Sequence, residues 1–170
     1  MANSCYVTGK AAARDVESLQ KFLDMLKDEK FLYQEFNTTE ITQIDANRYT
    51  AEFTGCVKWS IGSAINSDKY GEPLNKTTKG LLVEMWSQEP GCEFEEHVVY
   101  ANGVCICDEV TEYAEYYLDS FDSLEELNKE CETNLKEEDF DGDGIASVGG
   151  FIHFGTFTKL DKLGDEYFDL

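Results

Sequence analysis

Residues 92–110, with the sequence CEFEEHVVYANGVCICDEV, predict a β-hairpin. Two runs rich in β-branched and aromatic residues, Phe94–Tyr100 and Val104–Val110, flank a turn at Ala101-Asn102-Gly103. Asn-Gly between two such runs is a strong hairpin signal, because both residues accept the positive φ that a two-residue turn requires. We therefore expect two antiparallel strands here.

Upstream of the hairpin, strand-like and helix-like patterns alternate. Apolar residues recur at helical spacing between Ala12 and Asp28, and residues 49–59 alternate as in a strand, with a slip at Gly55. The apolar stripe of TTKGLLVEMWSQEPG, residues 77–91, ends at Pro90-Gly91 and predicts a second helix. The expected upstream elements are a strand at Ser4–Thr8, a helix at Ala12–Asp28, strands at Thr39–Ala46 and Asn47–Ile61, a loop at Gly62–Lys76 and a helix within residues 77–91.

Downstream of the hairpin, Ser123 with Glu126 three residues later has the capping-box pattern and predicts a helix over Ser123–Asn134. EYAEYYLD, residues 112–119, fits a strand or a helix, whereas Val148–Thr158 predicts a final strand before a tail. The order β-α-β-β-α-β-β in 170 residues predicts a single α+β domain spanning residues 1–170. We expect a ferredoxin-like antiparallel sheet with helices packed on one face.

Nearly all of the net negative charge lies in one half of the chain. The formal net charge is −21; residues 1–79 hold eleven acids and ten bases, whereas residues 80–170 hold twenty-four acids and four bases. From Gly80 to Asn128 there is no lysine or arginine. A general demand for solubility would acidify both halves, so the asymmetry favours a dedicated acidic face in the C-terminal half (80–170). A solvated face that touches nothing is the alternative.

The stretch Cys107–Glu126 is the centre of this base-free span and holds eight acids among aromatic residues. Tyrosine is favoured at protein interfaces, although the rings of Tyr113, Tyr116 and Tyr117 could instead cover a sheet. The expected partner-binding residues are Glu93, Glu95, Glu96, Asp108, Glu109, Glu112, Glu115, Tyr116, Asp119, Asp122, Glu125 and Glu126.

Direct binding of nucleic acid is disfavoured, because it depends on neutralising phosphates with Lys and Arg. The same charge could instead occupy a basic groove that evolved for phosphates. We therefore expect a non-enzymatic protein that binds a basic, nucleic-acid-binding host protein. Its target class would be a defence nuclease such as a CRISPR effector or a restriction enzyme, inhibited by occupation of its DNA- or RNA-binding channel. A calcium-binding or orphan protein-interaction module without nucleic-acid mimicry is the alternative.

Short motifs in the first 110 residues resemble a known family. MANSCYVTGKA (1–11), FTGCVKWSIGSA (53–64) and Glu-Pro-Gly followed by CEFEEHVVY (89–100) are similar to the YubB-type ferredoxin-like domains of phage and plasmid proteins. The resemblance implies a ferredoxin-like fold and a mobile-element origin, and it implies no catalytic residues. The acidic region Asp108–Asp143 has no counterpart in it.

DFDGDGIASVGG, residues 139–150, has part of the pattern of a calcium-binding loop. Asp139, Asp141 and Asp143 stand at positions 1, 3 and 5, and Gly144 at position 6. Position 12, where the pattern requires a bidentate Glu, is Gly150. A Ca²⁺ site at the three aspartates is therefore one hypothesis, and an acidic turn before a strand is the other. No other cofactor is expected.

Histidines and cysteines leave an enzyme as a further alternative. His97 and His153 both fall in expected strands, and either could pair with a thiol in space. The six cysteines are expected to be reduced and structural. Cys105 and Cys107 would share one face of a regular strand. The N-terminus has no pattern of a secretory leader, and no long apolar run suggests a membrane span, so we expect a cytoplasmic protein of the host cell.

Overall fold

The computed structural model describes residues 4–28, 36–58 and 60–168. They form an antiparallel eight-stranded sheet of order β2-β4-β1-β5-β6-β7-β8, in which β3 also pairs with β4. The strands are β1 (Ser4–Ala13), β2 (Phe36–Thr38), β3 (Thr42–Asp45), β4 (Arg48–Lys58), β5 (Leu81–Glu89), β6 (Phe94–Ala101), β7 (Val104–Tyr117) and β8 (Ile145–Gly149). The helices are α1 (Val16–Leu26), α2 (Ile61–Ile65), α3 (Gly71–Thr77), α4 (Leu124–Glu130) and α5 (Thr158–Phe168), with short 3₁₀ turns at Leu118–Ser120 and Glu137–Asp139.

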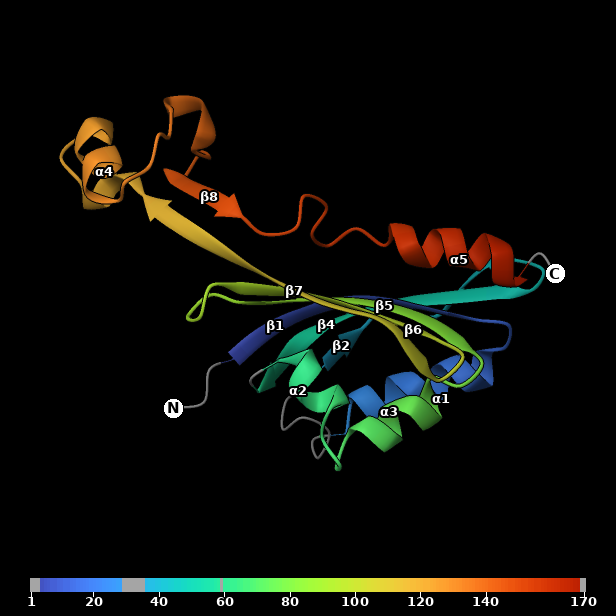
Figure 1. Cartoon of the computed structure of the whole chain (residues 1–170). Coiled ribbons are helices and arrows are strands. Elements are labelled where there is room, and N and C mark those ends of the chain that lie inside the picture. The colour runs from blue at the N-terminus through green and yellow to red at the C-terminus, as the bar shows by residue number, and fades with distance from the viewer. Residues whose placement is uncertain (1–3, 29–35, 59, 169–170) are drawn as a thin grey trace.

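Helices cover both faces of the sheet. Helices α1, α2 and α3 lie below it and α5 lies above it (Figure 1). The main core lies between the sheet and α1–α3 and includes Phe22 and Phe53, whose rings meet edge to face at 5.6 Å. A smaller cluster under α5 joins Leu82 to Leu160 and Phe168. The α+β class is confirmed. The expectation that the helices share one face is wrong for α5, and the ferredoxin-like arrangement stays a prediction.

The hairpin at residues 92–110 is confirmed as β6 and β7. Asn102 and Gly103 have φ angles of 51° and 81°, the positive values that a tight hairpin turn demands. A Cβ on Gly103 would stand 2.6 Å from the carbonyl oxygen of Asn75, so the turn packs directly onto the end of α3. Glycine is therefore required here for both its backbone angle and its small size.

The expected helix within residues 77–91 is wrong, because Leu81–Glu89 is the central strand β5. Leu81, Val83 and Met85 face the main core, whereas Leu82 faces α5. A strand covered on both faces has no polar alternation, so its sequence is easily mistaken for a buried helix.

Three other expectations are also corrected by packing. The expected loop Gly62–Lys76 contains α2 and α3, anchored by the buried Ile61, Ala64 and Leu74. The expected final strand Val148–Thr158 is wrong beyond Gly149, because the strand is β8 at Ile145–Gly149, and the expected tail forms α5. Helix α5 forms because Leu160 and Phe168 bury against the sheet. Residues 112–119, left open between strand and helix, belong mainly to β7.

A β-bulge separates the faces of Cys105 and Cys107. Cys105 pairs with Tyr100 and Cys107 with the adjacent Val99, so Ile106 is the extra residue. Neighbouring residues on a strand point to opposite faces. Cys105 therefore packs against the main core, while Cys107 faces α5. The expectation that the two thiols share a face is wrong, because the bulge reverses the alternation.

Residues 113–149 form an arm that projects beyond the main sheet (Figure 1). Strand β7 pairs with β6 as far as Glu112 and then with β8 from Tyr113 to Tyr117. The arm contains the outer part of β7, α4 and β8. The expected helix at Ser123–Asn134 is confirmed in part as α4, with the Ser123 hydroxyl accepting the Glu126 N–H at 3.2 Å.

Replacing Asp15 with alanine is expected to lower the free energy of unfolding by about 1 kcal/mol at pH 7. Asp15 caps α1 by accepting the Ser18 N–H at 2.7 Å, and this bond lowers the pKa of the carboxyl below its usual 3.8. Because the folded pKa is depressed, the stabilisation is present above pH 3.8 and is lost as the pH falls through the folded pKa. Urea denaturation of the wild type and of Asp15→Ala between pH 7 and pH 2 measures the difference in their free energies of unfolding. A difference that persists at the acid end would contradict the capping role.

Candidate functional site

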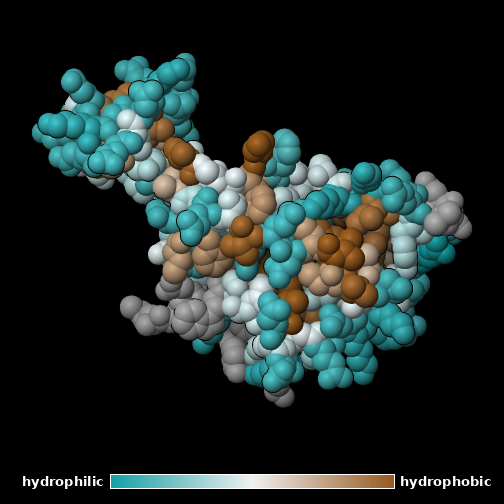
Figure 2. All heavy atoms as spheres, in the orientation of Figure 1, coloured by the Kyte–Doolittle hydropathy of each residue, from teal (hydrophilic) through white to brown (hydrophobic). Residues whose placement is uncertain are grey.

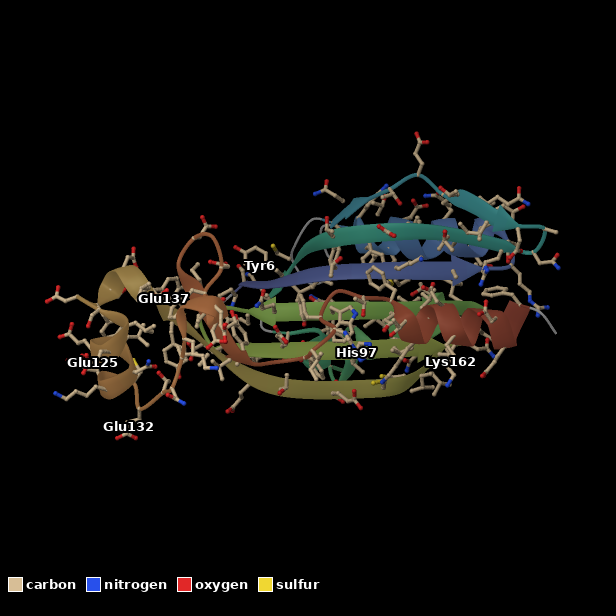
Figure 3. The ribbon with its side chains drawn as sticks, turned by 90° about the horizontal axis from the view of Figure 1, so that it is seen from above. Tyr6, His97, Glu125, Glu132, Glu137 and Lys162 are labelled. Atoms are coloured by element: carbon tan, nitrogen blue, oxygen red, sulfur yellow. The ribbon has the colours of Figure 1, made fainter. Side chains whose placement is uncertain are left out.

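The arm holds about half of the protein's net negative charge. Residues 113–149 contain twelve acids and two bases, against a net charge of −21 for the chain. Ten of the twelve acidic residues are exposed, and the other two are half-buried. In the space-filling view, hydrophilic side chains cover most of the arm (Figure 2). From above, the arm's labelled acids Glu125, Glu132 and Glu137 lie far from His97 on the sheet (Figure 3).

Internal hydrogen bonds tie the segments of the arm together. The Asn128 carboxamide accepts the Leu135 N–H at 2.7 Å and donates to the Leu135 carbonyl at 2.8 Å. Leu127, on the same helix, is fully buried, and the Leu118 N–H donates to the Gly144 carbonyl at 2.9 Å. The carboxylates are therefore presented on a folded support, which reduces the entropy lost when a partner binds.

Most of the predicted partner-binding residues lie on β7 or the arm. Asp108, Glu109 and Glu112 are exposed on β7, and Glu93 is exposed in the turn before β6 with φ of 52°. The arm carries Glu115, Tyr116, Asp119, Asp122, Glu125 and Glu126. The structure therefore brings six of the twelve predicted residues together on the arm.

Glu95 and Glu96 are buried, so the expectation that they contact a partner is wrong. Glu96 is 3% exposed and accepts the N–H groups of Ile61 and Gly62 at 2.8 and 3.2 Å and the Ser87 hydroxyl at 2.6 Å. Glu95 accepts the Phe151 N–H at 2.7 Å. Both carboxylates satisfy backbone donors of the segments that pack on the sheet. Sequence reasoning missed this because the donors lie far away in the chain.

Two aspartates of the calcium-like loop, Asp139 and Asp141, accept hydrogen bonds from nearby backbone N–H groups. Asp141 accepts the N–H groups of Asp143 and Ile145, both at 2.9 Å, and Asp139 accepts the Lys136 N–H at 2.7 Å. Gly144 has φ of 76°, which permits the sharp bend. The loop leads from a 3₁₀ turn into β8 and so differs from a helix-loop-helix calcium site. Calcium binding there stays a prediction.

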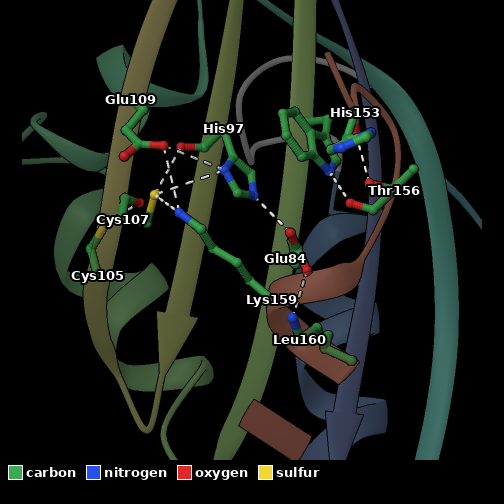
Figure 4. A network of polar contacts seen from close by, with 10 residues as sticks. Glu84, His97, Cys105, Cys107, Glu109, His153, Thr156, Lys159 and Leu160 are labelled. Atoms are coloured by element: carbon green, nitrogen blue, oxygen red, sulfur yellow. Dashed lines mark hydrogen bonds and ion pairs between the residues drawn. The ribbon is translucent and has the colours of Figure 1, made fainter. Parts of the chain in front are cut away.

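A second group of polar residues gathers around His97, on the face of the sheet that α5 covers (Figure 4). His97 is 4% exposed, and its ring is stacked on Trp86 with centroids 3.7 Å apart. Its Nε2 lies 2.7 Å from Oε1 of the fully buried Glu84, whose Oε2 accepts the Leu160 N–H at 2.6 Å. Glu84 therefore joins the central strand to both His97 and α5.

The other ring nitrogen of His97 faces a thiol, a carboxylate and an ammonium group. Nδ1 lies 3.9 Å from Cys107 Sγ and 3.8 Å from Glu109 Oε2. Lys159 Nζ lies 3.0 Å from the same sulfur and 3.6 Å from Glu109 Oε2. Glu84 and Lys159 were missed by the sequence reasoning. The signal for Glu84 was a single acid inside the apolar run LLVEMW, which indicates a buried and partnered carboxylate.

Burial and charge act in opposite directions on these groups. Burial raises the pKa of the Cys107 thiol, and the Lys159 ammonium opposes that rise. The hydrogen bond from Cys107, followed by the charge of Lys159, lowers the pKa of Glu109. The hydrogen bond with Cys107 raises the pKa of Lys159. A raised thiol pKa is the opposite of what activates a cysteine nucleophile.

His153 lies outside this group. It is exposed in the segment after β8, and its carbonyl accepts the Thr156 hydroxyl at 2.7 Å. The expectation that His153 lies in a strand is therefore wrong. A cleft of about 640 Å³ along α1 and α3 is lined by Lys21, Lys69 and Lys76 among others, and it includes neither histidine.

Comparisons with protein-family models, curated proteins and solved structures gave no match. The resemblance to YubB-type domains therefore stays a prediction. Within the described residues, no helix combines the length and the apolar character that crossing a membrane would need.

Proposed function

We propose that the protein acts by binding a basic partner protein through its acidic arm, and that it is not an enzyme. The observation that carries the proposal is the concentration of twelve acids and two bases in residues 113–149, most of them exposed. Opposite charges on two surfaces speed association and select the partner. The hydrogen bonds that fold the arm favour the same role.

The partner that best fits this surface is a nucleic-acid-binding nuclease of the host's defence, such as a CRISPR effector or a restriction enzyme. Such a protein binds phosphates in a basic channel, and duplex DNA presents about one negative charge per 1.7 Å of its axis. The arm would enter that channel and exclude the nucleic acid. The resemblance to phage and plasmid proteins is consistent with this role, which the protein would perform in the host cytoplasm.

Neutralising six exposed arm acids is expected to weaken binding by about 100-fold, because six exposed ion pairs contribute about 0.5 kcal/mol each. The variant replaces Asp119, Glu125, Glu130, Glu132, Glu137 and Asp143 with the corresponding amides. Purified CRISPR effectors and restriction enzymes would be tested as partners by pull-down. For any that bind, the dissociation constant would be measured at rising salt and with competing duplex DNA.

A matched control changes six exposed acids away from the arm to amides, at Glu17, Asp24, Glu40, Glu52, Asp68 and Glu72. It removes the same formal charge as the arm variant. Because these six residues lie away from the arm, the control is expected to weaken binding far less if the arm is the contact surface. Equal loss in the two variants would show that net charge alone matters. Binding that ignores salt, or that DNA does not displace, would contradict occupation of a nucleic-acid channel.

A further inference from the structure

Three side chains with different metal-ligating atoms meet on the α5 face of the sheet. His97 Nδ1, Cys107 Sγ and a carboxylate oxygen of Glu109 all lie within 4.8 Å of one another. His97 is directly opposite Glu109 on β6 and β7, and the bulge at Ile106 turns Cys107 toward the same face. Bulges commonly re-aim a side chain next to a functional site.

The surroundings of His97 select Nδ1 as the free ligand atom. Glu84 Oε1 lies 2.7 Å from Nε2, so the Nε2–H donates to this carboxylate and the Nδ1 lone pair points to Cys107 and Glu109. Glu84 is itself fixed, because its second oxygen accepts the Leu160 N–H at 2.6 Å. A carboxylate that orients a histidine in this way is the usual second contact of a metal-bound imidazole.

The position between the sulfur and the carboxylate already attracts a cation. Lys159 Nζ lies 3.0 Å from Cys107 Sγ and 3.6 Å from Glu109 Oε2. The lysine side chain is 45% exposed, so it can swing into solvent and leave the two groups to another cation.

We propose that His97, Cys107 and Glu109 bind a Zn²⁺ ion, with a water molecule as the fourth ligand. One nitrogen, one sulfur and one oxygen donor suit a borderline-soft cation with tetrahedral preference, whereas Mg²⁺ and Ca²⁺ select oxygen donors. The ion replaces the Lys159 ammonium between β6 and β7. This site is separate from the arm and does not depend on its partner.

Cobalt(II) is the probe, because thiolate-bound Co²⁺ has a near-ultraviolet charge-transfer band and its visible bands report four-coordination. Titration of the reduced full chain is expected to produce both features, and Zn²⁺ is expected to abolish them by displacement. Cys107→Ser is expected to remove the charge-transfer band, and Glu109→Gln to weaken binding at least tenfold. Cys131→Ser removes a half-buried thiol on the arm and is expected to leave the spectrum unchanged.

Lys159→Met is expected to raise the affinity for Zn²⁺ by roughly fivefold, because it removes a competing cation held by two partly exposed interactions. If His97, Cys107, Glu109 and Lys159 had a purely structural role, neither the wild type nor Lys159→Met would bind Zn²⁺. The proposal is overturned if neither the wild type nor Lys159→Met develops the thiolate band. It is equally overturned if Cys107→Ser keeps the band and Cys131→Ser loses it. Glu109 is largely exposed, so Glu109→Gln still tests the site if a cysteine variant fails to fold.

Discussion

Replacing Glu84 with alanine is expected to lower the free energy of unfolding by about 4 kcal/mol. The side chain is fully buried and accepts hydrogen bonds from the His97 ring and the Leu160 N–H. Alanine would leave both donors buried without a partner, and it would open a cavity between β5 and α5. Urea denaturation at pH 7, followed by circular dichroism, measures the change.

Two further substitutions separate this network from general effects of charge. Glu84→Gln keeps the shape of the side chain and one acceptor oxygen for the Leu160 N–H, while its NH2 can donate to Nε2 of the other His97 tautomer, so it is expected to lose less than half as much stability as alanine. Asp161→Ala removes an acid from α5 that forms only a largely exposed 3.4 Å ion pair with Lys10, so it is expected to leave the denaturation midpoint nearly unchanged. If Glu84→Ala were as stable as Asp161→Ala, then Glu84 would not be what joins α5 to the sheet.

Glu96→Ala is expected to lower the free energy of unfolding by about 3 kcal/mol. The buried carboxylate accepts two backbone N–H groups at the start of α2 and the hydroxyl of Ser87, so alanine leaves three donors without their acceptor. Thermal and urea denaturation would both show the loss. The matched control is Glu93→Ala, which removes an exposed acid three residues earlier.

The same pair of variants separates stability from partner binding. Both remove one negative charge, yet Glu96 is only 3% exposed and is buried away from any partner. Glu96→Ala is therefore expected to reduce stability and, while folded, to bind a basic partner as tightly as the wild type. A large loss of affinity in the folded variant would return Glu96 to the binding surface and contradict its role as an internal cap.

Charge on this molecule is separated in space as well as in sequence. The acidic arm projects from one end of the sheet (Figure 1), while a cleft along α1 and α3 is lined by four lysines and by the acids Asp68 and Glu72. A partner with a basic channel would therefore be attracted to the arm and less so to the helical layer. Interactions between charges are screened beyond about 10 Å at 0.1 M salt, so an approaching partner responds mainly to the charges nearest to it. Its basic channel is therefore expected to turn toward the arm during encounter.

Local sequence was sufficient for the elements whose signals are local. The hairpin follows from Asn102-Gly103 and α4 from the Ser123 cap, since each depends on residues a few positions apart. The apolar spacing predicted α1 as well, although the helix begins at Val16 and the expected start at Ala12 belongs to β1. The excess of acids in residues 80–170 is likewise a property of composition. These features needed no knowledge of which strands are neighbours.

Tertiary structure decided everything that depends on distant partners. Burial on both faces made Leu81–Glu89 a strand, and long-range hydrogen bonds turned Glu84, Glu95 and Glu96 inward. The bulge at Ile106 and the docking of α5 brought Cys107 and Lys159 to His97. The sequence by itself determined how acidic the protein is and where its strongest turn lies. Whether a given carboxylate meets solvent or a buried N–H depends on donors contributed by remote segments, and the folded chain alone brings these together.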